Sequence, residues 1–380
     1  MSPLAIFFLF LINSSLAANT NINNVQNYGA KSDGNTDSSK AFFSAWAAAC
    51  ASNTPATINV PIGKYLIHNA NFNGQTCKSK AITIHIDGTL LAPSDYNVID
   101  NDENWIKFEK VSGVSIYGGT FDGQGAGLWA CQNSNNKNCP DGTTTLTFYN
   151  SNNITMSGVT VQNSQKFQIL VDVSHNVKLQ GMKVLAQGNS KNTDGIHVKL
   201  SSGVRIMKSQ IGTGDQGRIY SVSRGIPASA TAGDDCISIS PGNSNLWIEG
   251  IACGPGHGIS IGSLGWKQQE LGVQNVTIKT VTFSGTTNGV RVKTWAIIMM
   301  RVVLSSSGIK ISDVTYQAIH ETSATKIAVK LDCSITNPCR GVVLEDLNLS
   351  YQNQQTEASC VNARGRVSGL QKPNNCLLKN

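Results

Sequence analysis

The chain has 380 residues, of which 30 are lysine or arginine and 23 are aspartate or glutamate, giving a net charge of +7. Hydrophobic residues make up 40% and charged residues only 14%, which excludes an intrinsically disordered protein and argues against a helix-rich or coiled-coil one. After the first 12 residues, no apolar run approaches the roughly 18 residues that a membrane span requires. Basic runs typical of a nucleic-acid-binding arm are absent, so the excess positive charge suits a polyanionic partner without identifying one.

The N-terminus carries the pattern of a secretory signal. An unbroken apolar stretch covers residues 4–12, and the small residues Ser15, Ala17 and Ala18 follow it. This pattern predicts a signal peptide over residues 1–18, cleaved after Ala17 or Ala18, and therefore a secreted, extracellular protein. A short buried N-terminal strand is the alternative interpretation.

The ten cysteines fall into five close pairs along the chain. Short gaps within the pairs and long gaps between them favour the local bridges Cys50–Cys77, Cys131–Cys139, Cys236–Cys253, Cys333–Cys339 and Cys360–Cys376, although sequence alone does not fix the connectivity. Disulfides agree with export, because they persist in oxidising compartments. No Cys-x-x-Cys pair occurs, so a zinc site is not expected. Asn153, Asn275 and Asn348 lie in sequons for glycan attachment.

The first regular element predicted is a helix over residues 36–50. Asp37 or Ser38 is the expected N-cap, and an alanine-rich segment with helical apolar spacing follows. We expect this helix to cover the open N-terminal end of the β structure that comes after it.

A repeated unit, a polar turn followed by alternating β runs, occupies most of the remaining chain. The eight copies begin at Ser112, Asn152, His175, Ser202, Ser244, Gln274, Ser307 and Arg340. Irregular spacings of roughly 23 to 42 residues indicate a solenoid whose insertions fall in turns. The alternation points valine, isoleucine and leucine inward, and stacked coils would lie about 4.8 Å apart.

The predicted fold is therefore all-β, a single right-handed parallel β-helix over residues 19–380 with a short N-terminal capping helix. A β-sandwich of antiparallel hairpins is the alternative, which the scarcity of tight Asn-Gly hairpin signals disfavours.

Four polar clusters occupy matching places on consecutive repeats. They are Asn192-Thr193-Asp194, Gly233-Asp234-Asp235, Gly256-His257-Gly258 and Arg291-Val292-Lys293. Equivalent positions stack in a parallel solenoid, so three carboxylates, one imidazole and two cations would form one patch. Taken singly, the clusters could be a turn, a calcium site at the paired aspartates, a histidine bonded to a carbonyl, or an exposed strand face. Their occurrence on successive coils, with glycines that let a ligand approach the backbone, favours a catalytic site.

The clusters, together with the segments at residues 25–34, 254–265 and 289–295, resemble plant polygalacturonases of glycoside hydrolase family 28. The resemblance runs from about Asn24 to the C-terminus. It implies a right-handed β-helix that hydrolyses α-1,4-galacturonosyl bonds of de-esterified pectin in the cell wall, with inversion and without a cofactor or metal. We expect a monomer whose partner is polygalacturonate, with no nucleic-acid or membrane partner for the mature chain.

The resemblance also assigns roles to individual residues. Asp234 is the expected general acid, Asp194 and Asp235 are expected to hold and activate the attacking water, and His257 would help set the protonation of the acid. The expected substrate-binding residues are Asn192, Gly258, Arg291 and Lys293. The roles are physically consistent, because closely spaced carboxylates raise one pKa and an anionic sugar requires cations.

Two departures from the family pattern bear on activity. Residues 215–233 interrupt the run from Ile-Gly-Thr-Gly into Asp-Asp-Cys, and one coil, with a cleft tyrosine, is missing after Trp295, where an apolar nonamer stands at residues 296–304. These departures predict weak or absent activity unless the insertion loops out cleanly. The alternative function is then a catalytically impaired or inactive pectin-binding isoform. A pectate lyase would need calcium and a cationic base, and the carboxylates with His257 favour hydrolysis; endo or exo action is left open.

Overall fold

The computed structural model describes residues 21–99, 103–134, 138–190, 193–214, 233–267, 269–295, 298–299, 302–303 and 309–379. The predicted signal peptide, Asn192 and residues 215–232 lie outside this part. Within it, no helix is long and apolar enough to cross a membrane.

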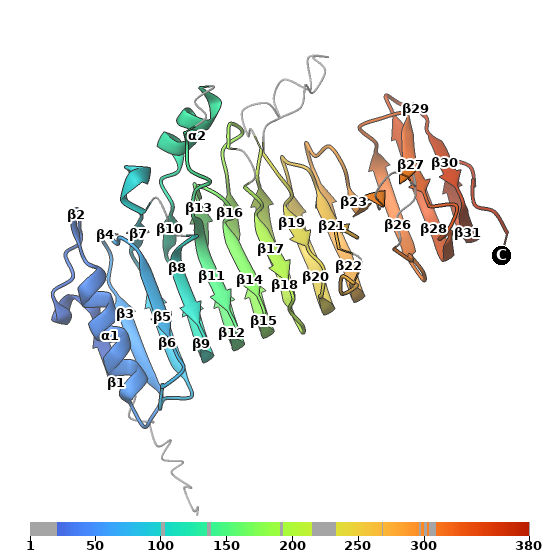
Figure 1. Cartoon of the computed structure of the whole chain (residues 1–380). Helices are drawn as coiled ribbons and strands as arrows, with labels where there is room; N and C mark the ends of the chain where they lie inside the picture. Colours follow the sequence, from blue (N-terminus) through green and yellow to red (C-terminus); the bar gives the residue numbers. More distant parts are fainter. Residues whose placement is uncertain are drawn as a thin grey trace, which may run out of the picture.

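Parallel strands stack rung upon rung along the length of the molecule, so the predicted right-handed parallel β-helix is confirmed (Figure 1). A 15-stranded sheet contains β1 (Asn21–Asn24), β2 (Asp33–Asp37), β3 (Ala56–Val60), β4 (Lys64–Leu66), β6 (Ile82–Ile86), β7 (Thr89–Leu91), β9 (Ser112–Tyr117), β10 (Thr120–Asp122), β12 (Asn152–Ser157), β13 (Thr160–Gln162), β15 (His175–Gln180), β16 (Lys183–Leu185), β18 (Arg205–Gly212), β20 (Ser244–Cys253) and β22 (Gln274–Phe283).

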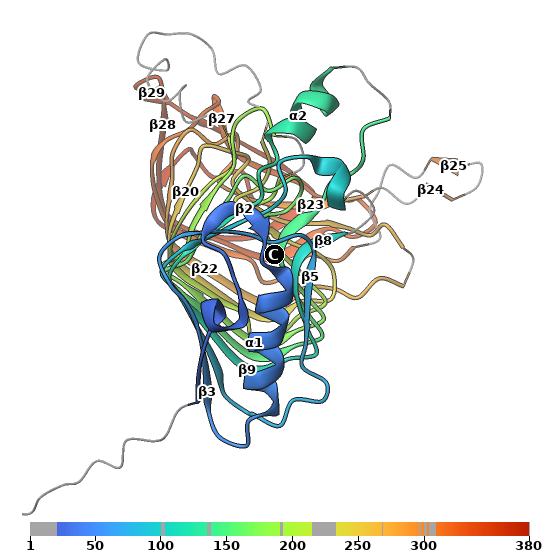
Figure 2. The ribbon, with the colours of Figure 1, turned by 90° about the vertical axis from the view of Figure 1, so that its left-hand side faces the viewer.

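An eight-stranded sheet lies across the coil from it (Figure 2). Its strands are β5 (Ala70–Asn73), β8 (Asn104–Glu109), β11 (Thr144–Tyr149), β14 (Ile169–Asp172), β17 (Ile196–Lys199), β19 (Ile237–Ile239), β21 (Ile259–Leu264) and β23 (Val290–Thr294).

The predicted inward alternation builds the core. On the long sheet, apolar side chains from successive rungs pair in one row that comprises Ile58, Ile84, Ile116, Met156, Leu179, Ile206 and Ile248. All seven are buried. On the short sheet, Phe72, Phe108 and Phe148 stack in register, with centroid spacings of 5.1 and 5.6 Å. Each coil therefore covers the apolar side chains of its neighbours, and outward positions remain free for chemistry.

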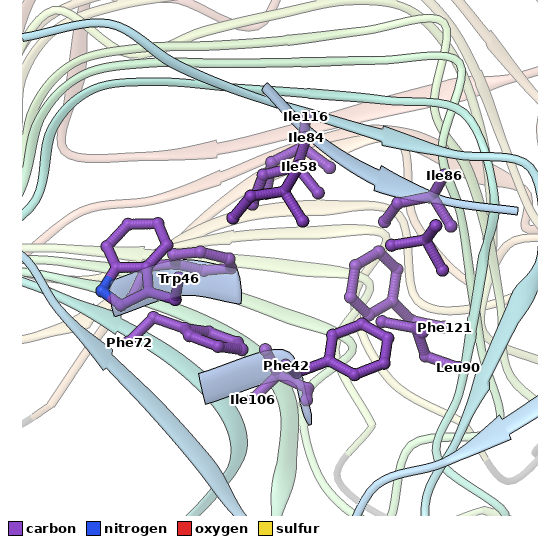
Figure 3. Close-up of a pocket in the computed structure, with 12 residues that line it drawn as sticks. Phe42, Trp46, Ile58, Phe72, Ile84, Ile86, Leu90, Ile106, Ile116 and Phe121 are labelled. Atoms are coloured by element: carbon purple, nitrogen blue, oxygen red, sulfur yellow. The ribbon is translucent and has the colours of Figure 1, made fainter. Parts of the chain in front are cut away.

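The capping helix is present as α1 (Ser39–Ala51). Ser38 occupies the N-cap position but makes no capping bond there, and the carboxylate of Asp37 accepts the Ser39 amide at 3.0 Å instead. Phe42 and Trp46 point from α1 into the first coils (Figure 3). The cavity between them and the strands is about 20 Å³ and apolar, so it offers a water no partner and leaves the end of the solenoid closed.

The structure adds a second helix, α2 (Ala126–Asn133), that the sequence analysis did not predict. It has eight residues, glycine at the N-cap and no side-chain capping bond, so neither its length nor its ends gave a helix signal. Two short 3₁₀ helices, η1 (Val25–Tyr28) and η2 (Tyr96–Ile99), precede it. All five predicted disulfides are confirmed, with none of the ten cysteines left free.

The strand ladder is interrupted after Trp295. The apolar nonamer contributes an antiparallel pair, β24 (Ile298–Met299) with β25 (Val302–Val303), rather than a coil. The solenoid resumes in two further sheets, β26 (Thr315–Thr322), β28 (Cys339–Tyr351), β29 (Gln354–Gln355) and β31 (Ala363–Lys372) in one and β27 (Ile327–Asp332) and β30 (Glu357–Val361) in the other. Among the described residues no strand of these sheets pairs with β22 or β23, and they enclose a core of their own.

The predicted strand run that begins at Ser307 is described only from Ile309 onward. Its first half starts outside the described residues and contributes one isolated bridge at Ser312, and its second half opens β26.

Candidate active site

The predicted clusters converge on four adjacent rungs of the eight-stranded sheet. Ile196 of β17 pairs with Ile237 of β19, which pairs with Ile259 of β21, which pairs with Val290 of β23. The residues two positions before these four are Asp194, Asp235, His257 and Asn288. Stacking thus brings together side chains that lie far apart in the sequence, and the amide nitrogen of Asn288 donates to the His257 carbonyl at 3.2 Å.

Asp235 is the most enclosed of the acids. It is 1% exposed. Its carboxylate lies 3.0 Å from Arg291 Nη2 and 3.1 Å from Lys293 Nζ, and it also accepts a bond of 2.7 Å from Ser260 Oγ. Arg291 Nε in turn donates to Ser260 Oγ at 2.7 Å. Two cations thus share one carboxylate, which leaves one net positive charge beside the other two acids.

Asp194 is held by a residue that the sequence analysis missed. His197 Nδ1 lies 2.8 Å from Asp194 Oδ2, and its Nε2 lies 2.9 Å from Ser240 Oγ. The imidazole stacks on Phe167 with a centroid distance of 4.4 Å and an interplanar angle of 16°. Its position three residues after Asp194 was the only available signal, and that spacing does not reveal a side-chain contact.

Asp234 contacts the His257 imidazole and the backbone amide of Asp235. His257 Nδ1 lies 3.5 Å from its Oδ1, and the same oxygen accepts the Asp235 amide at 2.9 Å. Asp234 and Asp194 also interact electrostatically. Asp234 is the more accessible of the two acids, with a side chain 24% exposed against 7% for Asp194.

The pKa values of Asp194 and Asp234 are shifted in opposite directions. Burial raises the pKa of Asp194 to about 6, and the negative charges of Asp234 and Asp235 act in the same direction. Burial also raises the pKa of Asp234, but hydrogen bonds from His257 and the Asp235 amide outweigh it and hold that pKa below its usual value. The carboxyl of Asp194 therefore keeps its proton to a higher pH than that of Asp234. The split between two close carboxylates was expected, but it falls on Asp194 rather than on Asp234.

We predict that Asp194→Asn gains stability relative to the unaltered chain as the pH rises from acid to neutral. The carboxyl has a higher pKa folded than unfolded, so its stabilising contribution is complete below pH 4 and is lost as the pH rises through about 6. Urea unfolding should show that the free energy of unfolding of the variant, relative to that of the unaltered chain, is higher at pH 7 than at pH 4 by up to about 3 kcal/mol. His197→Gln, which keeps a donor but removes the imidazole, is the comparison. A pH-independent difference between Asp194→Asn and the unaltered chain would contradict the raised pKa.

Gly258 has a structural reason to be glycine. A Cβ at this position would lie 2.3 Å from the Asn288 oxygen and 2.4 Å from the Gly289 oxygen, and φ is +93°. The predicted substrate-binding role of Gly258 stays a prediction, and that of Asn192 concerns a residue outside the described part.

The ends of the insertion lie side by side. A Cβ built on Gly233 would be 3.1 Å from the Cα of Gly214 and 1.9 Å from the Thr213 oxygen. Thr213 Oγ1 also donates to the Asp234 carbonyl. The chain thus leaves and re-enters the coil at one place, and Asp234 stays on its rung.

Asp234, Asp235 and His257 also offer oxygen and nitrogen atoms that lie within 4.8 Å of one another. A cation placed among them would meet the positive charges of Arg291 and Lys293, which already engage both oxygens of Asp235. The arrangement therefore favours proton chemistry over metal binding.

Comparisons with known proteins agree with this geometry. The profile of glycosyl hydrolases family 28 matches residues 50–225, 220–306 and 300–370. A polygalacturonase of Prunus persica is 50% identical, over 98% of both chains, and an exopolygalacturonase of Platanus acerifolia is 37% identical over 92% of this chain and 96% of its own. Among solved structures, an endo-xylogalacturonan hydrolase of Aspergillus tubingensis covers 92% of this chain and 99% of its own, with a TM-score of 0.72 and 20% identity, which shows the fold.

Proposed function

The chain belongs to family 28 of the glycosyl hydrolases, and we propose that it is a polygalacturonase that cleaves α-1,4-galacturonosyl linkages of de-esterified pectin with inversion. The observation that carries the proposal is the stacking of Asp194, Asp234, Asp235 and His257 on adjacent rungs, with Arg291 and Lys293 beside them. Acids supply protons and activate water, and cations bind an anionic sugar.

Asp234 is proposed as the acid that protonates the leaving glycosidic oxygen. It is the more exposed member of the pair, so it can reach a substrate, and it interacts electrostatically with Asp194, with which it would share one proton. A substrate that covers the site would further disfavour the charged form of Asp234 and draw the proton in that direction. Asp194 is then left charged and accepts a proton from the attacking water. His197, held by Ser240 and Phe167, would keep Asp194 aimed.

The contacts of the Asp235 carboxylate favour an inverting mechanism over one with a covalent intermediate on Asp235. Both of its oxygens are engaged by Arg291 and Lys293, so it is poorly placed to form a bond to the sugar. Water attack in a single displacement needs only an oriented water and a base. The positive charge that remains on the two cations would bind the galacturonate carboxylate.

The test is hydrolysis of polygalacturonate by the purified protein, followed as release of reducing ends. Proton NMR of the first products from a short galacturonate oligomer should show the β-anomer, which then mutarotates. Release of the α-anomer first would overturn inversion, and unsaturated products would identify a lyase. Absence of any reducing ends would favour the alternative, a pectin-binding protein without activity.

The insertion tests that alternative directly. We predict that excising residues 215–232, so that Gly214 joins Gly233, leaves a folded protein with at least the activity of the full chain. The two ends lie nearly within the span of one peptide unit, about 3.8 Å between α-carbons. Thermal melting and reducing-end assays on both forms would check this. A shortened chain that unfolds would contradict the observation that the insertion leaves the coil undisturbed.

Further support bears on organisation and location. The family match divides near residues 220 and 300, close to the proposed insertion at 215–233 and the proposed missing coil after Trp295. The five disulfides fit an extracellular protein. We propose accordingly that residues 1–18 are a secretory signal, that residues 19–380 form the hydrolase domain, and that the mature enzyme acts as a monomer in the cell wall.

A further inference from the structure

The outer face of the long sheet carries an unusual concentration of positive charge. Lys178 of β15, Arg205 and Lys208 of β18, and Lys279 of β22 are all exposed. We call these four residues the basic face. Glu249 of β20 is the one acid among the outward-facing residues of β12, β15, β18, β20 and β22.

The charges of the basic face are poorly compensated. Lys178 and Arg205 are direct partners on neighbouring rungs, and like charges placed opposite one another destabilise a sheet. Within the described part of the chain, Lys178, Arg205 and Lys208 make no ion pair. Glu249 forms its ion pair with Lys279, at 3.3 Å, and the charge of Lys208 also helps to lower the pKa of Glu249.

The eight-stranded sheet across the coil treats its cations differently. Lys107 pairs with Glu109 at 3.5 Å, and Lys199 pairs with Asp172 at 3.9 Å. Arg291 and Lys293 both pair with Asp235. Every lysine and arginine in the strands of the eight-stranded sheet is therefore paired, whereas three of the four cations of the basic face are not. Earlier rungs of the same outer row carry only the neutral residues Thr83, Ser115 and Thr155.

An exposed indole lies within the same surface. Trp247 of β20 pairs in register with Arg205 and is 37% exposed. Lys279 Nζ lies 4.5 Å from the centre of its ring, and its Nε1 donates to Glu249 at 2.8 Å. These two contacts fix the ring in place, so it presents a rigid apolar surface among the cations.

We propose that the basic face is a second binding site for the anionic polysaccharide, which holds a run of galacturonate units away from the bond that is cleaved. This proposal rests on the proposed function for the identity of the polymer. Adjacent rungs stand about 4.8 Å apart, so the four rungs from β15 to β22 span about 14 Å, comparable to a short run of sugar units. Carboxylates repeated along a chain would meet cations repeated along the sheet, with Trp247 against a sugar ring.

The test compares two triple variants with equal loss of charge. Lys178→Gln, Arg205→Gln and Lys208→Gln neutralise three of the four residues of the basic face, and Lys31→Gln, Lys40→Gln and Lys64→Gln neutralise three exposed lysines at the N-terminal end. Binding to long polygalacturonate is measured in an Asp234→Asn background, which prevents degradation, with a trigalacturonate present in excess to fill the catalytic site. Hydrolysis of trigalacturonate by the same triples with Asp234 intact is measured separately.

We expect the basic-face variant to bind long polygalacturonate about tenfold more weakly at low salt, and the slope of log affinity against log salt to fall by about 2, the value for three lost contacts to a single-stranded polyanion. The N-terminal control should change less than twofold, and trigalacturonate hydrolysis should be unaltered in both. Trp247→Ala should weaken binding without changing the salt slope.

Equal weakening in both triples would overturn the site, because net charge alone would then explain binding, and so would unaltered binding in the basic-face variant. If the unaltered chain hydrolyses no oligomer, the proposed function fails, but the binding comparison still decides whether the basic face holds the polymer.

Discussion

Asp234→Asn is expected to lower kcat on polygalacturonate about a thousandfold while the protein stays folded, because an amide cannot protonate the leaving oxygen. The side chain keeps its shape, and its oxygen can still accept the Asp235 amide and face His257. The measurement is initial reducing-end release across pH, with circular dichroism to confirm the fold. A variant that retains more than a tenth of the original kcat would remove Asp234 from the role of acid.

A second substrate separates Asp234 from Asp194. A galacturonide with an activated aryl leaving group needs no proton to depart, so Asp234→Asn should hydrolyse it at close to the unaltered rate. Asp194→Asn should fail on both substrates, because it lacks the base for water. The raised pKa of Asp194 would make that residue the acid if pKa order alone decided the roles. The reverse pattern of rates would establish that assignment.

The fold could be predicted because short-range patterns in the sequence determine it. Alternation within each repeat identifies the inward side chains, and the solenoid brings the repeats into register without any long-range information. Close cysteine spacing likewise gave the correct bridges. The helix α2 and the β24–β25 pair escaped prediction because each is short and lacks the caps or turn residues that mark an element.

The site could be predicted only in part, for a related reason. Spacing placed Asp194, Asp235 and His257 on successive rungs, which requires only knowledge of the repeat. The partners of these groups depend on how side chains turn once they are there. Nothing in the sequence indicates that His197 binds Asp194 or that Ser260 contacts both Asp235 and Arg291.

The same limit applies to the two cations. Arg291 and Lys293 alternate outward on β23. That pattern alone favoured an exposed strand face, and the family resemblance assigned the two residues to the substrate carboxylate. The structure places both on Asp235, whose burial the sequence does not reveal. If they bind substrate as proposed, they do so while they also hold a buried carboxylate.

Asp235→Asn is accordingly expected to damage stability as well as activity. The carboxylate is buried and carries three polar contacts, so its neutralisation leaves Arg291 and Lys293 facing each other without a counter-charge. Breaking a buried ion pair costs about 3–5 kcal/mol, and the lower end applies here because both cations are about one-third exposed. Urea unfolding at pH 6 should show a loss of about 3 kcal/mol.

Two further variants make that result specific. Asp172→Asn on β14 neutralises a carboxylate whose ion-pair partner, Lys199, is half-exposed and 3.9 Å away, so it should change stability by less than about 1 kcal/mol. Adding Arg291→Gln to Asp235→Asn removes one of the stranded charges, so the double variant should be more stable than the sum of the two single losses. If Asp235→Asn costs no more than Asp172→Asn, or if the two losses simply add, the buried carboxylate is not what holds the cations in place. Arg291 and Lys293 would then have to be positioned by β23 itself.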